Sequence, residues 1–188
     1  MEQLENKISI LVIENDNNDQ LLLKEYLQNT NLDIENIEMA HTLEEAKKKF
    51  KHHDFSLVLL DLFLPDSSGL KSFTSLLQLN PRIPVIILSG LSDTKISLKA
   101  LSLGAQDFLI KGDYNVKILE KTVQYSIERK KNLETIEENV ERFNLVSMAT
   151  HDIVWDWNLK TGEVYSSKDG WQIILKFVEG TDTEGEAG

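Results

Sequence analysis

Polar side chains that could support phosphoryl chemistry follow four short apolar runs of the sequence, at the points where those runs end. Residues 14–16, Glu-Asn-Asp, follow the first run, Asp61 follows another, and Ser89 and Lys111 follow two more. Carboxylates and other oxygen donors can bind a hard divalent cation such as Mg2+. A carboxylate can also attack phosphorus once a metal ion and a lysine offset the charge of the phosphoryl oxygens. If folding brings them together, these residues suit the formation of an aspartyl phosphate.

Five apolar runs that are too short for helices predict the strands that would position these side chains. The runs are Ile8–Ile13, Ile34–Ala40, Phe55–Leu60, Pro84–Leu88 and Asp107–Ile110. The first, third and fourth consist mainly of Ile, Leu and Val, which is typical of parallel strands covered by helices on both faces. The second alternates apolar with polar residues and is predicted to be an edge strand.

Helical patterns separate these strands. They cover residues 18–28, 43–51, 70–79 and 93–103, with a fifth from about Val116. Thr42 and Glu45 form a capping box at the second helix, and Gly104 is placed for a left-handed residue after the fourth. The alternation predicts an α/β fold with a doubly wound, five-stranded parallel sheet in flavodoxin-like order 2-1-3-4-5, followed by an extended C-terminal helix. In such a sheet the ligand site lies at the carboxyl ends of the strands, where the polar side chains converge.

The composition of the chain argues against some classes of binding partner. The chain has 188 residues, no cysteine and a formal net charge of -11. Binding to nucleic acid or to an anionic membrane is not expected, because both need a basic face. Apolar stretches stay short of the roughly 18 residues that a membrane span needs, and acidic residues precede the first apolar run, unlike in a secretory signal. We therefore expect a cytoplasmic protein that binds neither nucleic acid nor membrane.

Four motifs resemble the receiver domain of response regulators, the phosphoryl-accepting module of two-component signalling. They are ILVIEND at the first strand, LVLLDLFLPDSSGL around Asp61, VIILSG ending at Gly90, and GAQDFLIKGD around Lys111. The resemblance runs from about Lys7 to Lys130, and the order and spacing of the motifs are far more specific than any one of them. It implies a receiver domain over residues 1–130 that is not itself an enzyme.

The resemblance implies roles for the residues at the strand ends. Asp61 would accept the phosphoryl group from a histidine kinase or a phosphotransfer protein. Glu14 and its neighbour Asn15 would bind Mg2+ together with Asp61 and the backbone carbonyl of Phe63. Lys111 would contact the phosphoryl group.

Two further residues would transmit the signal in a receiver of this kind. Ser89 would be the switch hydroxyl, and Phe108 the switch aromatic that turns inward after Ser89 moves. A plain packing role on the last strand explains Phe108 equally well.

Asn15 departs from the family pattern, which usually has an acid in contact with the metal at this position. An amide binds Mg2+ more weakly than a carboxylate does, so we expect weak metal binding unless Asp16 compensates through a shifted loop. The alternative is a degenerate receiver that acts as a protein-interaction module without phosphorylation. A true enzyme, such as an aspartate-nucleophile phosphatase of the haloacid dehalogenase type, would have a second acid two residues after Asp61, where this chain has Phe63.

A continuous helical pattern without Gly or Pro runs from Val116 to about Thr150. Residues 131–150 are therefore interpreted as a helical linker that extends beyond the receiver domain. Within it Leu133, Ile136, Val140 and Phe143 occupy a and d heptad positions, which indicates a possible homodimer seam. A solvated linker helix is the alternative.

Residues 151–188 differ in composition from the rest. Two alternating segments joined at residues 160–162 predict a hairpin, and the acidic, Gly-rich end predicts a disordered tail. The stretch around WDW resembles the opening of a PAS sensor domain, and 38 residues would make it incomplete. His151 superficially resembles the phosphoacceptor of a histidine kinase, but the aromatic strand pattern after Asp152 favours the PAS interpretation.

Overall fold

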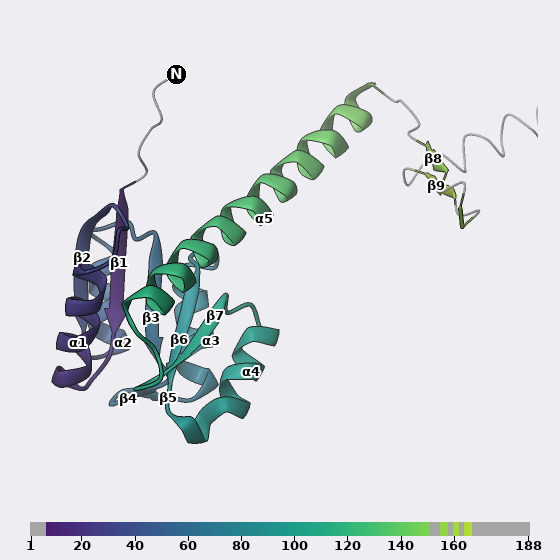
Figure 1. Ribbon diagram of the computed structural model, residues 1–188. Helices are drawn as coiled ribbons and strands as arrows, with labels where there is room; N and C mark the ends of the chain where they lie inside the picture. Colours follow the sequence, from purple (N-terminus) through teal and green to yellow (C-terminus); the bar gives the residue numbers. More distant parts are fainter. Residues whose placement is uncertain (1–6, 151–154, 158–159, 162–163, 167–188) are drawn as a thin grey trace, which may run out of the picture. The chain divides into compact units, whose positions relative to one another are not determined.

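The structure is a computed structural model that describes residues 7–150, 155–157, 160–161 and 164–166 (Figure 1). The chain divides into two compact units, one up to Glu134 and one from Thr135. The first unit holds the sheet and the helices around it. No helix in the described ranges is long and apolar enough to span a membrane.

The main sheet has five parallel strands in the order β2-β1-β3-β6-β7, which confirms the predicted 2-1-3-4-5 order and the edge position of the second strand. The strands are β1 (Ile8–Ile13), β2 (Ile34–Ala40), β3 (Leu57–Asp61), β6 (Val85–Ser89) and β7 (Asp107–Ile110). The bounds of two strands shift: β6 begins and ends one residue later than predicted, and β3 ends one residue later. The strand β3 begins two residues later than predicted. Phe55 lies before the strand and packs its ring edge-on against that of Phe50, with 5.4 Å between the ring centroids.

Helices cover both faces of this sheet (Figure 1). They are α1 (Asn17–Gln28), α2 (Leu43–Phe50), α3 (Leu70–Leu79), α4 (Thr94–Ser102) and α5 (Val116–Thr150). A 3-10 turn, Leu91–Asp93, precedes α4. The helix α4 therefore begins one residue later than predicted, and it ends one residue earlier. The other helices lie within one residue of their predicted bounds.

Alternate side chains of each strand point to opposite faces, which divides the core into two layers. One layer packs against α1 and the first part of α5; its strand residues include Ile10, Val12, Leu57, Leu59, Ile86 and Leu88. The other packs against α2, α3 and α4; its strand residues include Leu11, Ile13, Val58, Leu60, Val85 and Ile87. Because both faces are buried, the central strands need the nearly continuous apolar sequence that predicted them.

The predicted helix ends agree in part with the structure. The Thr42 side chain accepts a hydrogen bond from the Glu45 N–H at 3.1 Å, as a capping box requires. The Glu45 carboxylate, however, accepts from the N–H of His41 at 2.7 Å and not from that of Thr42. Gly104 has φ of +108°, which confirms the left-handed residue after the fourth helix.

A short antiparallel pair, β4 (Phe63–Leu64) and β5 (Ser67–Ser68), follows Asp61, where the sequence analysis predicted no strand. Pro65 and Asp66 form its two-residue turn. Each of these strands has only two residues, which is too short to show an alternation of apolar and polar residues. The sequence pattern therefore could not predict this element.

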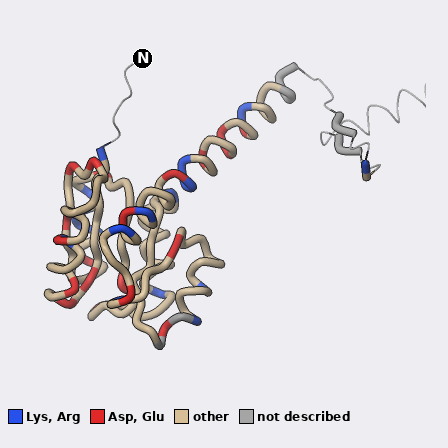
Figure 2. The backbone as a smooth tube through the Cα atoms, viewed as in Figure 1, with Lys and Arg blue, Asp and Glu red and all other residues tan. Residues whose placement is uncertain are grey.

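The second half of α5 and a strand pair belong to the second unit. Along α5 acidic and basic residues are interspersed (Figure 2), and the four predicted seam residues, Leu133, Ile136, Val140 and Phe143, are each about half exposed. The strands β8 (Trp155–Trp157) and β9 (Val164–Ser166) pair in antiparallel register, which confirms the two strands of the predicted hairpin. His151 and the predicted disordered tail lie outside the described residues.

Candidate functional site

The polar residues selected from the sequence lie at one edge of the sheet, at the carboxyl ends of its strands. Glu14 directly follows β1, Asp61 is the last residue of β3, Ser89 is the last of β6 and Lys111 directly follows β7. The strand order reverses between β1 and β3, which is where open α/β sheets bind ligands. The topology thus places Glu14 and Asp61 on either side of this point, with Ser89 and Lys111 at the ends of the next two strands.

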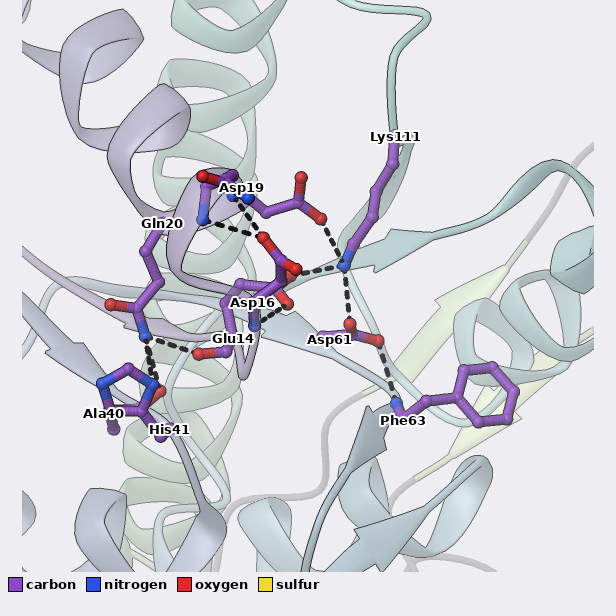
Figure 3. A network of polar contacts seen from close by, with 10 residues as sticks. Glu14, Asp16, Asp19, Gln20, Ala40, His41, Asp61, Phe63 and Lys111 are labelled. Atoms are coloured by element: carbon purple, nitrogen blue, oxygen red, sulfur yellow. Dashed lines mark hydrogen bonds and ion pairs between the residues drawn. The ribbon is translucent and has the colours of Figure 1, made fainter.

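The Lys111 ammonium joins three carboxylates (Figure 3). Its Nζ lies 2.7 Å from Asp61 Oδ2 in a hydrogen bond. It also lies 2.5 Å from Glu14 Oε2 and 3.0 Å from Asp19 Oδ2 in ion pairs. The structure therefore brings the predicted Glu14, Asp61 and Lys111 into direct contact and adds Asp19, which the sequence analysis did not select.

Burial sets the electrostatics of this cluster. The Glu14 side chain is fully buried and that of Asp61 is 8% exposed, whereas those of Lys111 and Asp19 are 26% and 39% exposed. Burial raises the pKa of Glu14 above its ordinary value, and the nearby charge of Asp61 adds to this, although the Lys111 ammonium acts in the opposite direction. Burial would lower the pKa of Lys111, but its hydrogen bonds to the three carboxylates outweigh burial and raise it.

The loop after β3 fixes the second oxygen of Asp61. The N–H of Phe63 donates to Asp61 Oδ1 at 2.9 Å, an arrangement typical of an aspartate at the start of a turn. The carbonyl of Leu62 accepts from the Gly69 N–H at 2.8 Å and from the Ser72 hydroxyl at 2.8 Å. These bonds orient the Asp61 carboxylate and leave Phe63, the predicted carbonyl ligand, beside it.

Asp66 ties this loop to α2. Its two carboxylate oxygens accept from the N–H groups of Leu43 and Glu44, at 3.1 and 3.0 Å. The first N–H groups of a helix lack partners within the helix, so a carboxylate from elsewhere in the chain can cap them. The start of α2 is thereby attached to the loop that carries Asp61.

Ser89 is buried on the adjacent strand. It is 1% exposed, and its hydroxyl has no hydrogen-bond partner among the described residues. Its carbonyl accepts from the Lys111 N–H at 2.8 Å, so the backbones of the predicted hydroxyl and the predicted lysine are joined. Phe108, on β7, is half-buried and packs against the core layer beneath α2, α3 and α4.

The segment after β1 shows where Asn15 and Asp16 lie. Asn15 is exposed. Asp16 is the N-cap of α1: its Oδ1 accepts from the N–H groups of Asn18 and Asp19, at 2.8 and 3.1 Å. Its own N–H donates to Glu14 Oε1 at 3.0 Å. Asp16 therefore holds the loop and the start of α1 in place around Glu14.

Gln20 is a second residue that the sequence analysis missed. It is buried, and its Nε2 lies 2.5 Å from the carbonyl of Glu14 and 3.2 Å from His41 Nδ1 (Figure 3). These contacts connect α1 to the ends of β1 and β2. No motif of the sequence marks a glutamine for this position, because the role depends on which face of α1 meets the sheet.

The donor set suits Mg2+ in its chemistry. In the part of the chain that the structure describes, no group of three or more His, Asp or Glu side chains is arranged around a common metal position; the Lys111 ammonium stands among the carboxylates instead. Three carboxylates against one ammonium leave two negative charges in excess. Mg2+ binds through one or two carboxylates and keeps several waters, and the carboxylates of Glu14 and Asp61 are ligands of this type.

Known proteins are similar to this chain in sequence over the part that holds the sheet. The chain is 30% identical over 125 residues to the transcriptional regulatory protein ZraR of Salmonella typhimurium, covering 65% of this chain and 28% of ZraR. It is 33% identical over 105 residues to the transcriptional regulatory protein MalR of Bacillus subtilis, covering 55% of this chain and 44% of MalR. The chain thus spans less than half the length of these relatives.

Solved structures show the same fold. A two-component response regulator from Clostridium difficile matches with a TM-score of 0.57 and 26% identity, over 65% of this chain and 98% of that one. The receiver domain of NtrX from Brucella abortus matches with a TM-score of 0.58 and 23% identity, over 64% of this chain and 98% of that one. The response regulator receiver domain model matches residues 10–124, and the chain belongs to this family.

Proposed function

We propose that the chain accepts a phosphoryl group on Asp61 from a histidine kinase or a phosphotransfer protein and relays the signal by a conformational switch. One observation carries the proposal: at the sheet edge the Lys111 ammonium lies 2.7 Å from the Asp61 carboxylate and also contacts a buried acid, Glu14. A carboxylate held beside a lysine and a potential metal ligand has what phosphoryl transfer needs, namely position and opposing charge.

In the transfer step, an Asp61 carboxylate oxygen forms a bond to phosphorus while the bond from phosphorus to the nitrogen of the donor histidine breaks. Oδ2 is the oxygen that contacts Lys111. The ammonium is therefore placed to contact the negatively charged phosphoryl oxygens once the phosphoryl group is attached to Asp61. Glu14, Asp61 and the Phe63 carbonyl would hold Mg2+, which when bound offsets charge on the phosphoryl group.

The switch would pass through Ser89 and Phe108. A buried hydroxyl without a partner gains a hydrogen bond when a phosphoryl oxygen arrives, and the cost of leaving such a group unpaired is about 1 to 3 kcal/mol. The Ser89 carbonyl is bonded to the Lys111 N–H, so movement at Ser89 acts on the end of β7, where Phe108 lies. This gives the signal a physical connection from Asp61 to the face of α4.

The rest of the chain would connect the receiver to a partner. Residues 131–150 would act as a helical linker, and Leu133, Ile136, Val140 and Phe143 would pair with the same residues of a second copy, because four half-exposed apolar side chains at heptad spacing gain from burial. Residues 151–188 would be the start of a PAS-like segment, which the WDW strand and its antiparallel partner support. We place the protein in the cytoplasm.

Incubation with acetyl phosphate and Mg2+, followed by intact-mass measurement, tests the proposal. The wild-type protein should gain one phosphoryl group and Asp61→Asn none. Asp54→Asn, which removes an exposed acid just before β3, should be labelled as the wild type is. A folded wild-type protein that remains unlabelled at saturating Mg2+ would favour the degenerate, binding-only receiver, for which Asn15 is the motivation.

A further inference from the structure

We infer that Asp19 supplies, from the first turn of α1, the second carboxylate beside Glu14 in the acidic pair that the metal site lacks at Asn15. The inference rests on the proposed phosphoryl-acceptor function. Asp19 Oδ2 lies 3.0 Å from the Lys111 Nζ that also contacts Glu14 and Asp61, whereas Asn15 is exposed and carries no charge. The acidic pair of this site is therefore Glu14 with Asp19 and not Glu14 with its sequence neighbour.

Asp16, the other candidate for this role, is already engaged. Its Oδ1 accepts from two N–H groups at the start of α1, at 2.8 and 3.1 Å. A capping carboxylate of this kind contributes about 0.5 to 2 kcal/mol to helix or protein stability, so turning it toward a metal would lose that contribution. One of its two donors is the N–H of Asp19, so the cap also fixes the backbone from which the Asp19 side chain extends.

The geometry allows Asp19 to act on a cation held by Glu14 and Asp61. One carboxylate oxygen of each of these residues lies 2.5 to 3.0 Å from Lys111 Nζ. The distance between any two of these oxygens is therefore no greater than the sum of their distances to that nitrogen. Mg2+ bonds oxygen at about 2.0 to 2.1 Å and keeps several waters. A carboxylate at this range reaches either the metal or a water bound to it, and in both cases contributes a full negative charge.

An independent observation indicates that the cluster is built for a cation. Glu14 Oε2 is completely buried, and among the described residues it faces the Lys111 ammonium, at 2.5 Å. A buried carboxylate oxygen without a donor is expensive unless a charge faces it. When Lys111 follows the phosphoryl group, Glu14 and Asp19 both lose this ammonium, and a divalent cation restores the balance for both.

Calorimetric titration of the full chain with Mg2+ alone tests the inference without phosphorylation. Asp19→Asn should weaken Mg2+ binding by about 10- to 100-fold, the usual loss when one ligand or its support is removed. The single variant Asn15→Asp should bind Mg2+ more tightly than the wild type does. In the Asp19→Asn background Asn15→Asp should recover most of the lost affinity, because the second carboxylate is then supplied from the loop.

Two further variants separate a direct effect of Asp19 from indirect ones. Asp16→Asn removes a charge from the same segment but keeps the cap, since Asn caps helices about as well as Asp; its Mg2+ affinity should stay within about threefold of the wild type. Asp19→Asn should also weaken binding when Lys111 is replaced by Met, because the loss then cannot come from a displaced ammonium. Circular dichroism confirms that each variant is folded.

The outcomes distinguish this inference from the proposed function. If Asp19→Asn binds Mg2+ with the affinity of the wild type, the role of Asp19 is overturned and the proposed function is not. A tenfold loss in Asp16→Asn that exceeds the loss in Asp19→Asn would assign the second carboxylate to Asp16 and overturn it as well. A folded wild-type protein that binds no Mg2+ would contradict both the inference and the metal-dependent function.

Discussion

Lys111 Nζ lies 2.7 Å from Asp61 Oδ2, although fifty residues separate the two in the sequence and β6 lies between their strands in the sheet. The long lysine side chain spans the end of β6 to reach the carboxylate. The contact therefore depends on the strand order as well as on the two residue types. It is the interaction on which the proposed chemistry depends most.

Replacing Lys111 by Met should slow the phosphorylation of Asp61. The ammonium is the positive side chain in contact with the Asp61 carboxylate, and removal of one group that stabilises transition-state charge costs about 100- to 1000-fold in rate. The measurement is the initial rate of labelling by acetyl phosphate at saturating Mg2+. Lys24→Met, on the exposed surface of α1, is the matched control and should react at the wild-type rate. A wild-type rate for Lys111→Met would remove the lysine from the mechanism.

Glu14 should make the protein less stable as the pH rises. Its pKa in the folded state is raised above the ordinary value of 4.5, chiefly by burial. The folded state therefore holds the proton more tightly than the unfolded state, so the stability from this group is complete below 4.5 and is lost as the pH rises through the folded-state pKa. Glu14→Gln lacks this dependence.

Urea unfolding without Mg2+ at a series of pH values measures this effect. The free energy of unfolding of Glu14→Gln, relative to that of the wild type, should increase as the pH rises above 4.5 and become constant once Glu14 is ionised in the folded state. Glu25→Gln, which removes an exposed acid on α1, is the control for the substitution itself. The opposite trend would mean that the Lys111 ammonium, and not burial, dominates the environment of Glu14.

Asp66→Ala should destabilise the protein by about 1 kcal/mol, because it removes the side chain that caps α2 from the loop after Asp61. Asp66→Asn should lose less, since its amide oxygen still accepts one of the two hydrogen bonds. Chemical denaturation provides both values, and Asp54→Ala serves as an exposed control. Equal stability of Asp66→Ala and the wild type would show that Thr42 alone caps the helix.

The α5 seam should control the oligomeric state. Ile136 and Val140 are 59% and 54% exposed, and replacing both by Asn removes the apolar surface at adjacent heptad positions. Light scattering should then show half the wild-type mass. Glu138→Gln, on the same helix but outside the seam, should keep the wild-type mass. A monomeric wild-type protein, or a double variant that stays dimeric, would contradict the seam.

Much of the fold and site could be predicted because a parallel sheet constrains both. Strands covered on two faces must be apolar along their length, so the polar residue that ends each run marks a carboxyl end. All such ends lie at one edge, which is why Glu14, Asp61 and Lys111 could be grouped although they are far apart in the sequence. The predicted strand order then followed from the alternation with helices.

The unpredicted features depend on local geometry that no run of residues encodes. Asp19 reaches Lys111 only because Asp16 caps α1 and thereby sets where the first turn begins. Gln20 is buried because of the face that α1 turns to the sheet, and Asp66 caps α2 because of the small β4 and β5 turn. Each is a polar residue in a region rich in polar residues, so its type alone gives no signal.

Localising the phosphoryl group after reaction with acetyl phosphate and Mg2+ tests the central claim most directly. Peptide mapping by mass spectrometry should find a single modified peptide containing Asp61, and hydroxylamine should release the group, as expected of an acyl phosphate. Asp61→Asn should show no modification of that peptide. A phosphoryl group found on His151 or on a hydroxyl residue, at the level reached by the wild type, would contradict the assignment of Asp61 as the phosphoacceptor.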